Sequence, residues 1–186
     1  MTIYNMERES ILLNGRETDW NTLKSDIEIF YSVWTPIILD LYKLNINKND
    51  ILNFNNSLDK AIIFMKNEDK TNIIYEIANL YSYLPKYIEK YSNDNLNINL
   101  YKIKSCIINS YSEIEKDNWS EIEKQLQDAE KYFMVIINEI TEDQMMYNID
   151  KSYILFKEFQ NSIASKDKEL FYIKYKNLME ELNILK

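Results

Sequence analysis

Two Ser-x-x-Lys sequences, Ser57–Lys60 and Ser165–Lys168, have the spacing best suited to nucleophilic catalysis. In some acyl-enzymes this spacing lets the lysine activate the serine hydroxyl. Neither sequence is accompanied by the Ser-Asp-Asn or Lys-Thr-Gly motif of those enzymes, and a chain rich in serine and lysine contains such pairs by chance. The single cysteine, Cys106, lies on an apolar helical stripe, so we expect a buried and unreactive thiol. We therefore expect no enzymatic activity.

Four aspartates precede predicted helices and would gather at one end of a stacked array, where a cation site is conceivable: Asp19, Asp69, Asp117 and Asp167. Helix capping explains each of them separately, because an aspartate side chain accepts hydrogen bonds from the free amides at a helix start. The chain has no histidine and one glycine, which removes the commonest metal ligand and the means to build a phosphate-binding loop. We expect no metal and no cofactor.

Tyrosines provide the best candidate for a binding surface. Tyr83, Tyr87 and Tyr91 are spaced four residues apart and share one helical face beside Pro85. Such a stripe could stack a ligand or anchor a partner, whereas buried tyrosines at the same spacing would belong to the core. Solvent exposure of this stripe would distinguish the two interpretations. The candidate binding residues are Tyr81, Tyr83, Tyr87, Tyr91, Pro36 and Pro85.

The charge balance argues against nucleic acid as a partner. Thirty acidic and 22 basic residues give a net charge of −8, and two arginines leave few groups able to grip phosphates. The apolar runs are too short for a transmembrane segment. No leader peptide is visible, so we expect a cytoplasmic protein if Met1 is the true start, and otherwise a membrane-anchored extracytoplasmic one.

Apolar residues recur at intervals of three and four along nearly the whole chain, which predicts an all-α protein. Three tryptophans on these stripes are expected in the core: Trp20, Trp34 and Trp119. The predicted helices lie near 19–44, 50–66, 70–91, 98–115, 118–140, 142–164 and 167–185, with a short additional helix around 3–13.

Capping signals support these limits. Asn118–Glu121 and Thr141–Gln144 match the capping box, and Asp50 and Asp167 are placed to cap the helices that follow them. The polar, asparagine-rich segment 92–99 predicts a longer loop. We expect a single domain over 1–186, with 92–99 as the candidate sub-boundary between two helical halves.

Short acidic breaks recur along the chain at spacings of 50, 48 and 50 residues, and the apolar positions after them stay in register. This regularity predicts about four repeats of ~49 residues, each a helical hairpin. Short turns favour antiparallel neighbours, and hairpins with one apolar face must pack together. The sequence leaves open a helical bundle or a short α-solenoid.

The stretch Ile77–Pro85, preceded by the Asp19–Trp34 helix, resembles a group of uncharacterised helical proteins of clostridia and related low-GC Gram-positive bacteria. The resemblance covers roughly residues 18–140 and rests on amphipathic patterns. Many members of that group look like lipoproteins behind an N-terminal leader, whereas this chain shows neither a leader nor a lipid-accepting cysteine near its start. The resemblance implies no catalytic residues.

Two functional interpretations follow. The first is a non-enzymatic protein-interaction or scaffold protein that presents a helical surface to another protein. The alternative is an extracytoplasmic ligand-binding lipoprotein whose leader is missing from this chain, with its ligand near Tyr81–Tyr91.

Overall fold

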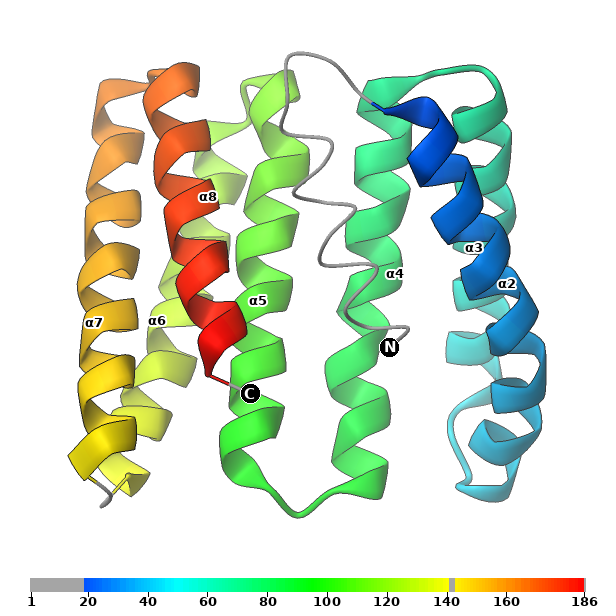
Figure 1. Cartoon of the computed structure of the whole chain (residues 1–186), viewed down its shortest axis with the longest axis horizontal. Helices are drawn as coiled ribbons and strands as arrows, with labels where there is room; N and C mark the ends of the chain where they lie inside the picture. Colours follow the sequence, from blue (N-terminus) through cyan, green and yellow to red (C-terminus); the bar gives the residue numbers. More distant parts are fainter. Residues whose placement is uncertain (1–18, 141–142, 186) are drawn as a thin grey trace. The chain divides into compact units, whose positions relative to one another are not determined.

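The computed structural model describes residues 19–140 and 143–185, and within these ranges every regular element is helical. The predicted short helix at 3–13 and the predicted capping residue Thr141 lie outside the described residues. The all-α fold class is confirmed (Figure 1). The α-helices are α2 (Trp20–Lys43), α3 (Lys48–Lys66), α4 (Lys70–Tyr91), α5 (Asn95–Glu113), α6 (Trp119–Glu139), α7 (Asp143–Ser162) and α8 (Lys168–Ile184).

The chain divides into two compact units, Met1–Tyr91 and Ser92–Lys186. Among the described residues, the first unit contains α2 to α4 and the second contains α5 to α8. The division falls at the start of segment 92–99, where the sequence places its candidate sub-boundary. The organisation of 1–186 as a single domain stays a prediction.

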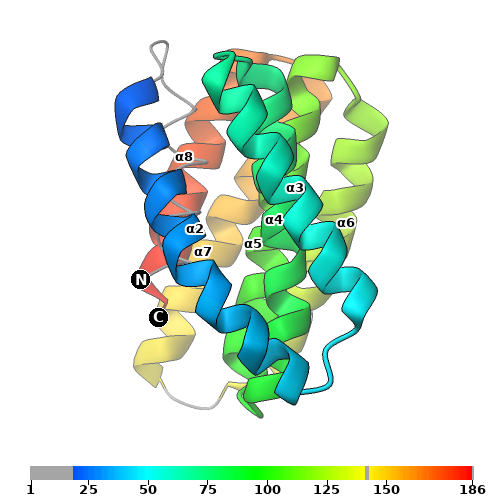
Figure 2. The ribbon, with the colours of Figure 1, turned by 90° about the vertical axis from the view of Figure 1, so that its right-hand side faces the viewer.

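In the first unit, α3 packs along both α2 and α4. Its apolar stripe makes this possible, because Ile51, Phe54 and Leu58 are at most 2% exposed. Helix α2 contributes its predicted stripe, which includes the buried side chains of Phe30 and Trp34. Figure 2 shows α2 and α3 beside each other in this unit.

The second unit is a four-helix bundle in which contacts run in a closed ring. Helix α5 packs against α6, α6 against α7, α7 against α8, and α8 against α5. Each helix therefore covers its apolar stripe with two neighbours from its own unit. Phenylalanines at the centre, such as Phe133, Phe156 and Phe171, are fully buried.

Within residues 19–140 and 143–185, four connections use a residue in the left-handed backbone conformation, and none of the four is glycine: Asn45, Glu68, Asp117 and Lys166. At Asn45, Glu68 and Asp117 the following residue donates its amide to a carbonyl five residues back, as in Ile46 to Leu41 at 3.1 Å. This is the Schellman arrangement, which satisfies carbonyls at a helix end. The chain thus ends its helices with ordinary residues where glycine is the usual choice.

Three of these turns share one layout. Glu68, Asp117 and Lys166 are spaced 49 residues apart (68 to 117, 117 to 166), and each lies two residues before the next helix. The helices on either side of each turn pack together: α3 with α4, α5 with α6, and α7 with α8. The regular turn spacing is consistent with a duplicated sequence, and the four-repeat interpretation stays a prediction.

The predicted helix limits need correction at three points. Helix α5 begins at Asn95 rather than near 98, because Asp94 accepts the Asn97 amide at 3.1 Å and caps the helix inside the expected loop. Asp50 lies in the first turn of α3, which is capped by Asn47. The N-cap Asn118 makes no side-chain capping bond, and its amide donates to the Glu113 carbonyl rather than to Glu121, so the predicted capping box at Asn118–Glu121 is wrong.

The four aspartates of the acidic breaks divide into two groups. Three of them accept hydrogen bonds from backbone amides: Asp19 from Thr22, Asp69 from Asn72, and Asp167 from both Glu169 and Leu170. Asp117 instead adopts the left-handed conformation before the N-cap. Capping is therefore confirmed for Asp19, Asp69 and Asp167 and is wrong for Asp117.

Candidate binding surfaces

An aromatic cluster forms the centre of the first unit. The rings of Trp34 and Phe54 stack with centroids 4.0 Å apart, and Tyr87 lies 6.0 Å from Phe54 and 6.2 Å from Trp34. The Trp34 indole donates a hydrogen bond of 2.6 Å to Asn55 Oδ1. These ring contacts join the three helices. The hydrogen bond to Asn55 sets the orientation of the indole.

The tyrosines of the predicted binding surface differ in their exposure to solvent. Tyr81 and Tyr87 are 0% and 5% exposed and belong to the core, Tyr83 is half-buried, and Tyr91 is 55% exposed. The contiguous exposed stripe that the binding interpretation requires therefore does not form. Tyr87 packs against Phe54 of α3, whereas Tyr91 is the last residue of α4 and is turned about 40° further around the helix.

The two prolines also differ in their surroundings. Pro36 lies inside α2 and is exposed, whereas Pro85 lies inside α4 and is buried. Both helices continue past their proline. The contribution of Pro36 and Pro85 to a binding surface stays a prediction.

Tyr83 shares its surroundings with an ion pair. Lys86 lies 5.0 Å above the Tyr83 ring and 3.6 Å from the Asp50 carboxylate. Burial raises the pKa of Tyr83, and the negative charge of Asp50 raises it further. The phenol therefore stays protonated at neutral pH and acts as a hydrogen-bonding and packing group.

A second feature of the first unit is a groove between α2 and α3. It has a volume of about 240 Å³, with Tyr31 on one wall, Ile62 on the other, and Glu28 and Lys66 among its lining residues. Tyr42 follows Tyr31 by eleven residues, which is three helical turns, so the two lie on one side of α2. Four side chains of these two helices are 42–54% exposed: Tyr31, Tyr42, Leu52 and Ile63. We call this set the α2–α3 surface.

Helical spacing places each pair on one face of its own helix. Leu52 and Ile63 are also eleven residues apart on α3, and Ile63 follows the groove residue Ile62. Because α2 and α3 are consecutive and antiparallel, Tyr31 lies at the Ile63 end and Tyr42 at the Leu52 end. The α2–α3 surface is therefore an apolar strip with one pair of side chains at each end.

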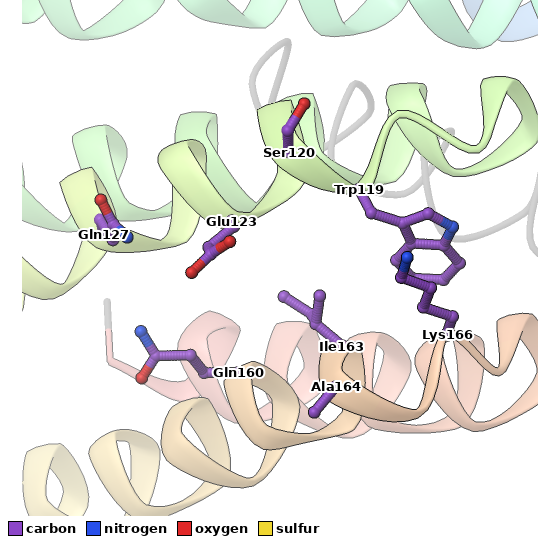
Figure 3. Close-up of a pocket in the computed structure, with 8 residues that line it drawn as sticks. All are labelled: Trp119, Ser120, Glu123, Gln127, Gln160, Ile163, Ala164 and Lys166. Carbon is purple, nitrogen blue, oxygen red and sulfur yellow. The ribbon is translucent and has the colours of Figure 1, made fainter.

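A cleft of about 520 Å³ opens in the second unit between α6 and the end of α7 (Figure 3). Figure 3 shows Trp119 and Lys166 at one end, Gln127 at the other, and Ile163 directed into the space between the helices. Trp119 is half-buried and lines this cleft, so its expected place in the core is wrong. The complete lining is Trp119, Ser120, Glu123, Gln127, Gln160, Ile163, Ala164 and Lys166.

Gln160 is held in place at the cleft by a polar network. Its side-chain nitrogen donates to Glu130 Oε2 at 3.2 Å, and its oxygen accepts from Lys157 Nζ at 2.8 Å. Glu130 also accepts from Lys157 at 2.7 Å and from the Tyr153 hydroxyl at 3.2 Å. Hydrogen bonds from Lys157 and Gln160 hold the pKa of Glu130 below its usual range, so the carboxylate is ionised at neutral pH.

The residues considered for catalysis and metal binding occupy structural positions. Cys106 is buried, and burial raises its pKa to about 12, which makes the thiolate scarce at neutral pH. Ser165 donates its hydroxyl to the Ser162 carbonyl, and Lys60 pairs with the buried Glu76 at 3.8 Å. In the part of the chain that the structure describes, no three acidic or cysteine side chains are grouped to hold a metal ion.

Comparison of the chain with protein-family models, curated proteins and solved structures finds no match. None of the helices in the described ranges combines the length and apolar character needed to cross a lipid bilayer.

The cleft was not identified from the sequence. Trp119 fits the apolar stripe of α6 as well as any core residue, and Gln160 and Lys166 are ordinary polar residues near a helix end. A signal does exist in retrospect, because Trp119 is the first residue of its helix. A large aromatic ring in a first helical turn has fewer neighbours to cover it than one in the middle of the helix.

Proposed function

We propose that this chain is a non-catalytic helical protein that binds another protein through the α2–α3 surface. The observation that carries the proposal is the pairing of a groove with four exposed apolar side chains at three-turn spacing on two adjacent helices. An amphipathic helix of a partner presents apolar residues at such spacing and fits a groove between two helices.

The exposure of these side chains supports binding over a purely structural role. Ile63 and Leu52 each leave 54% of their surface in water, and Tyr31 leaves 49%. Single exposed apolar residues are common, but a set that flanks one groove is typical of interaction sites. The groove residues Glu28 and Lys66 carry opposite charges on the two walls, so they offer a partner one acidic and one basic contact.

The proposal is tested with the double variant Tyr31→Ser/Ile63→Ser. Proteins captured by the wild-type chain from its native cells are identified, purified and titrated against both chains. We expect the variant to bind its partner at least about tenfold more weakly, because two apolar anchors are lost. The matched control is Ile154→Ser/Ile173→Ser in the second unit, whose side chains are 60% and 58% exposed.

The outcomes that contradict the proposal are specific. A purified partner that binds the α2–α3 double variant and the control variant equally well would place its site elsewhere. A wild-type dimer that the α2–α3 variant converts to a monomer would identify a second copy, rather than another protein, as the occupant.

A second candidate function, binding of a small ligand, is favoured by the α6–α7 cleft. Its volume of about 520 Å³ falls in the range of small-molecule sites. This candidate corresponds to the ligand-binding alternative, with the ligand in the second unit rather than near Tyr81–Tyr91.

A further inference from the structure

We infer that the α6–α7 cleft binds a short peptide with free ends, about three residues long, with its carboxylate at Lys166 and its amino group at Glu123. This inference concerns the second unit and stands independently of protein binding at the α2–α3 surface. It rests on the distribution of charge, apolar surface and amide groups around the cleft.

The charged groups of the cleft are kept apart. Lys166 lies at the Trp119 end and Glu123 lies toward the Gln127 end (Figure 3). Within the described ranges, neither side chain makes an ion pair or a hydrogen bond with another residue. Elsewhere in this unit lysines pair readily with carboxylates, as Lys131 does with Asp128 at 2.6 Å. A ligand that carries opposite charges at its two ends would satisfy both groups.

The middle of the cleft is apolar. Ile163 projects into the space between the helices, and Ala164 and the Trp119 ring contribute further carbon surface (Figure 3). An apolar side chain in the middle of a peptide would remove this surface from water. The indole gives a broad flat wall against which such a side chain can lie.

Two glutamine amides lie at the Glu123 end of the cleft, where they can bond the first residue of the peptide (Figure 3). Gln160 uses one amide hydrogen for Glu130 and one oxygen lone pair for Lys157, so one donor and one acceptor position remain. Because the Glu130–Lys157 pair fixes this side chain, little entropy is lost when it binds a ligand. The Gln127 side chain makes no hydrogen bond with the described residues and offers a second amide.

The length of the cleft sets the size of the ligand. Its α6 wall runs from Trp119 to Gln127, which corresponds to about 12 Å of helix. An extended peptide advances about 3.3–3.6 Å per residue. About three residues therefore fit within the length of the cleft.

The experiment titrates the full chain with three unblocked tripeptides: Ala-Leu-Ala, Ala-Phe-Ala and Ala-Val-Ala. Binding is followed by calorimetry and by tryptophan fluorescence, and Trp119→Phe serves to assign the fluorescence change to the cleft. We expect binding of at least one tripeptide, with affinity reduced about tenfold by Lys166→Gln and by Glu123→Gln, since each removes one charge-assisted contact. Lys176→Gln and Glu180→Gln, exposed on α8, are the matched controls.

Blocked peptides assign the two ends. Acetylation of the peptide amino group should abolish the effect of Glu123→Gln, and amidation of its carboxylate should abolish the effect of Lys166→Gln. The inference is overturned if none of the three tripeptides binds at millimolar concentration. It is also overturned if the blocked peptides bind as tightly as the free ones, or if the α8 controls weaken binding as much as the cleft variants.

Discussion

Both units bury the apolar stripes of their helices, but the described residues form four helices in the second unit and three in the first. In the second unit each helix packs against two others, and the stripe of α6 is sealed, with Ile122, Leu126 and Phe133 all 0% exposed. In the first unit α2 packs along α3 and meets α4 through the Trp34–Tyr87 ring pair. Its central stripe stays 5–7% exposed from Ile27 to Trp34.

This difference accompanies a difference in where the two candidate binding surfaces lie. The ring seals the stripe of α6, and the cleft forms near one end, where α6 begins and α7 finishes. A row of three described helices leaves a groove along its length, which is where the α2–α3 surface lies. The candidate binding surface thus lies near an end where each helix has two neighbours and along a side where the described helices form a row.

The largest expected effect is the loss of a ring from the sealed core. Phe133→Ala should lower the free energy of unfolding by about 3–5 kcal/mol, since it removes a fully buried ring and leaves a cavity. Phe30→Ala, at the 6% exposed position of α2, should cost about 2–3 kcal/mol because solvent can enter part of the space. Urea unfolding followed by circular dichroism measures both, with the exposed Met134→Ala as control. Equal losses would contradict the contrast between the units.

The stability of each unit can be followed separately. In Trp119→Phe the remaining tryptophans, Trp20 and Trp34, lie in the first unit, whereas the buried Cys106 lies in the second. We expect fluorescence to change at a urea concentration about 1 M below that at which the thiol reacts with a disulfide reagent, a difference of about 1–3 kcal/mol. Coincident transitions would show that the units unfold together.

The buried polar contact of the first unit gives a smaller effect. Asn55→Ala removes the acceptor of the Trp34 indole hydrogen bond and should cost about 1–2 kcal/mol, because the N–H stays buried without a partner. Asn56→Ala, at the adjacent exposed position, should change the unfolding free energy by less than about 0.5 kcal/mol. If both variants are equally stable, the indole does not depend on Asn55.

The smallest effect concerns the network beside the cleft. Glu130→Gln should cost at most about 1 kcal/mol at neutral pH, because its ion pair with Lys157 is partly exposed. The pKa of Glu130 is lowered from 4.5 in the folded chain, so its stabilising contribution is complete above that pH and is lost as the pH falls through the lowered pKa.

The pH dependence provides the check. The difference between wild type and Glu130→Gln should shrink below about pH 4.5 in unfolding experiments. The Glu123 side chain, on the same helix, makes no comparable bonds with the described residues, so Glu123→Gln should change the unfolding free energy at neutral pH by less than about 0.5 kcal/mol. A difference that stays constant from pH 7 to pH 3 would contradict a contribution from the ionised carboxylate.

Much of the helical organisation could be predicted from local signals. The stripe of Ile122, Leu126 and Phe133 has the three- and four-residue period of a buried helix face, and it is buried. The α5 start was missed because Asp94 belongs to a run of asparagines that looks like a loop, although an aspartate followed by asparagines also makes a good cap. Helix limits depend on single capping bonds, which a polar segment does not reveal.

The binding features depended on tertiary contacts. Tyr87 and Tyr91 differ by one turn of the same helix, yet one packs against Phe54 and the other is 55% exposed. Trp34 and Trp119 both lie on apolar stripes, yet one is central in its helix and buried while the other begins its helix and lines a cleft. Sequence spacing gives the face of a residue, whereas burial depends on which helix lies opposite.

The sequence by itself determined the helical class and most of the core stripes, because helical periodicity is a property of neighbouring residues. It also determined three of the aspartate caps, since an aspartate at a helix start bonds to amides within three residues of itself. Only the tertiary structure decided that four helices close a ring in the second unit, which tyrosines are exposed, and where the groove and the cleft lie. Those features arise from contacts between residues far apart in the chain, and no local pattern encodes which two faces meet.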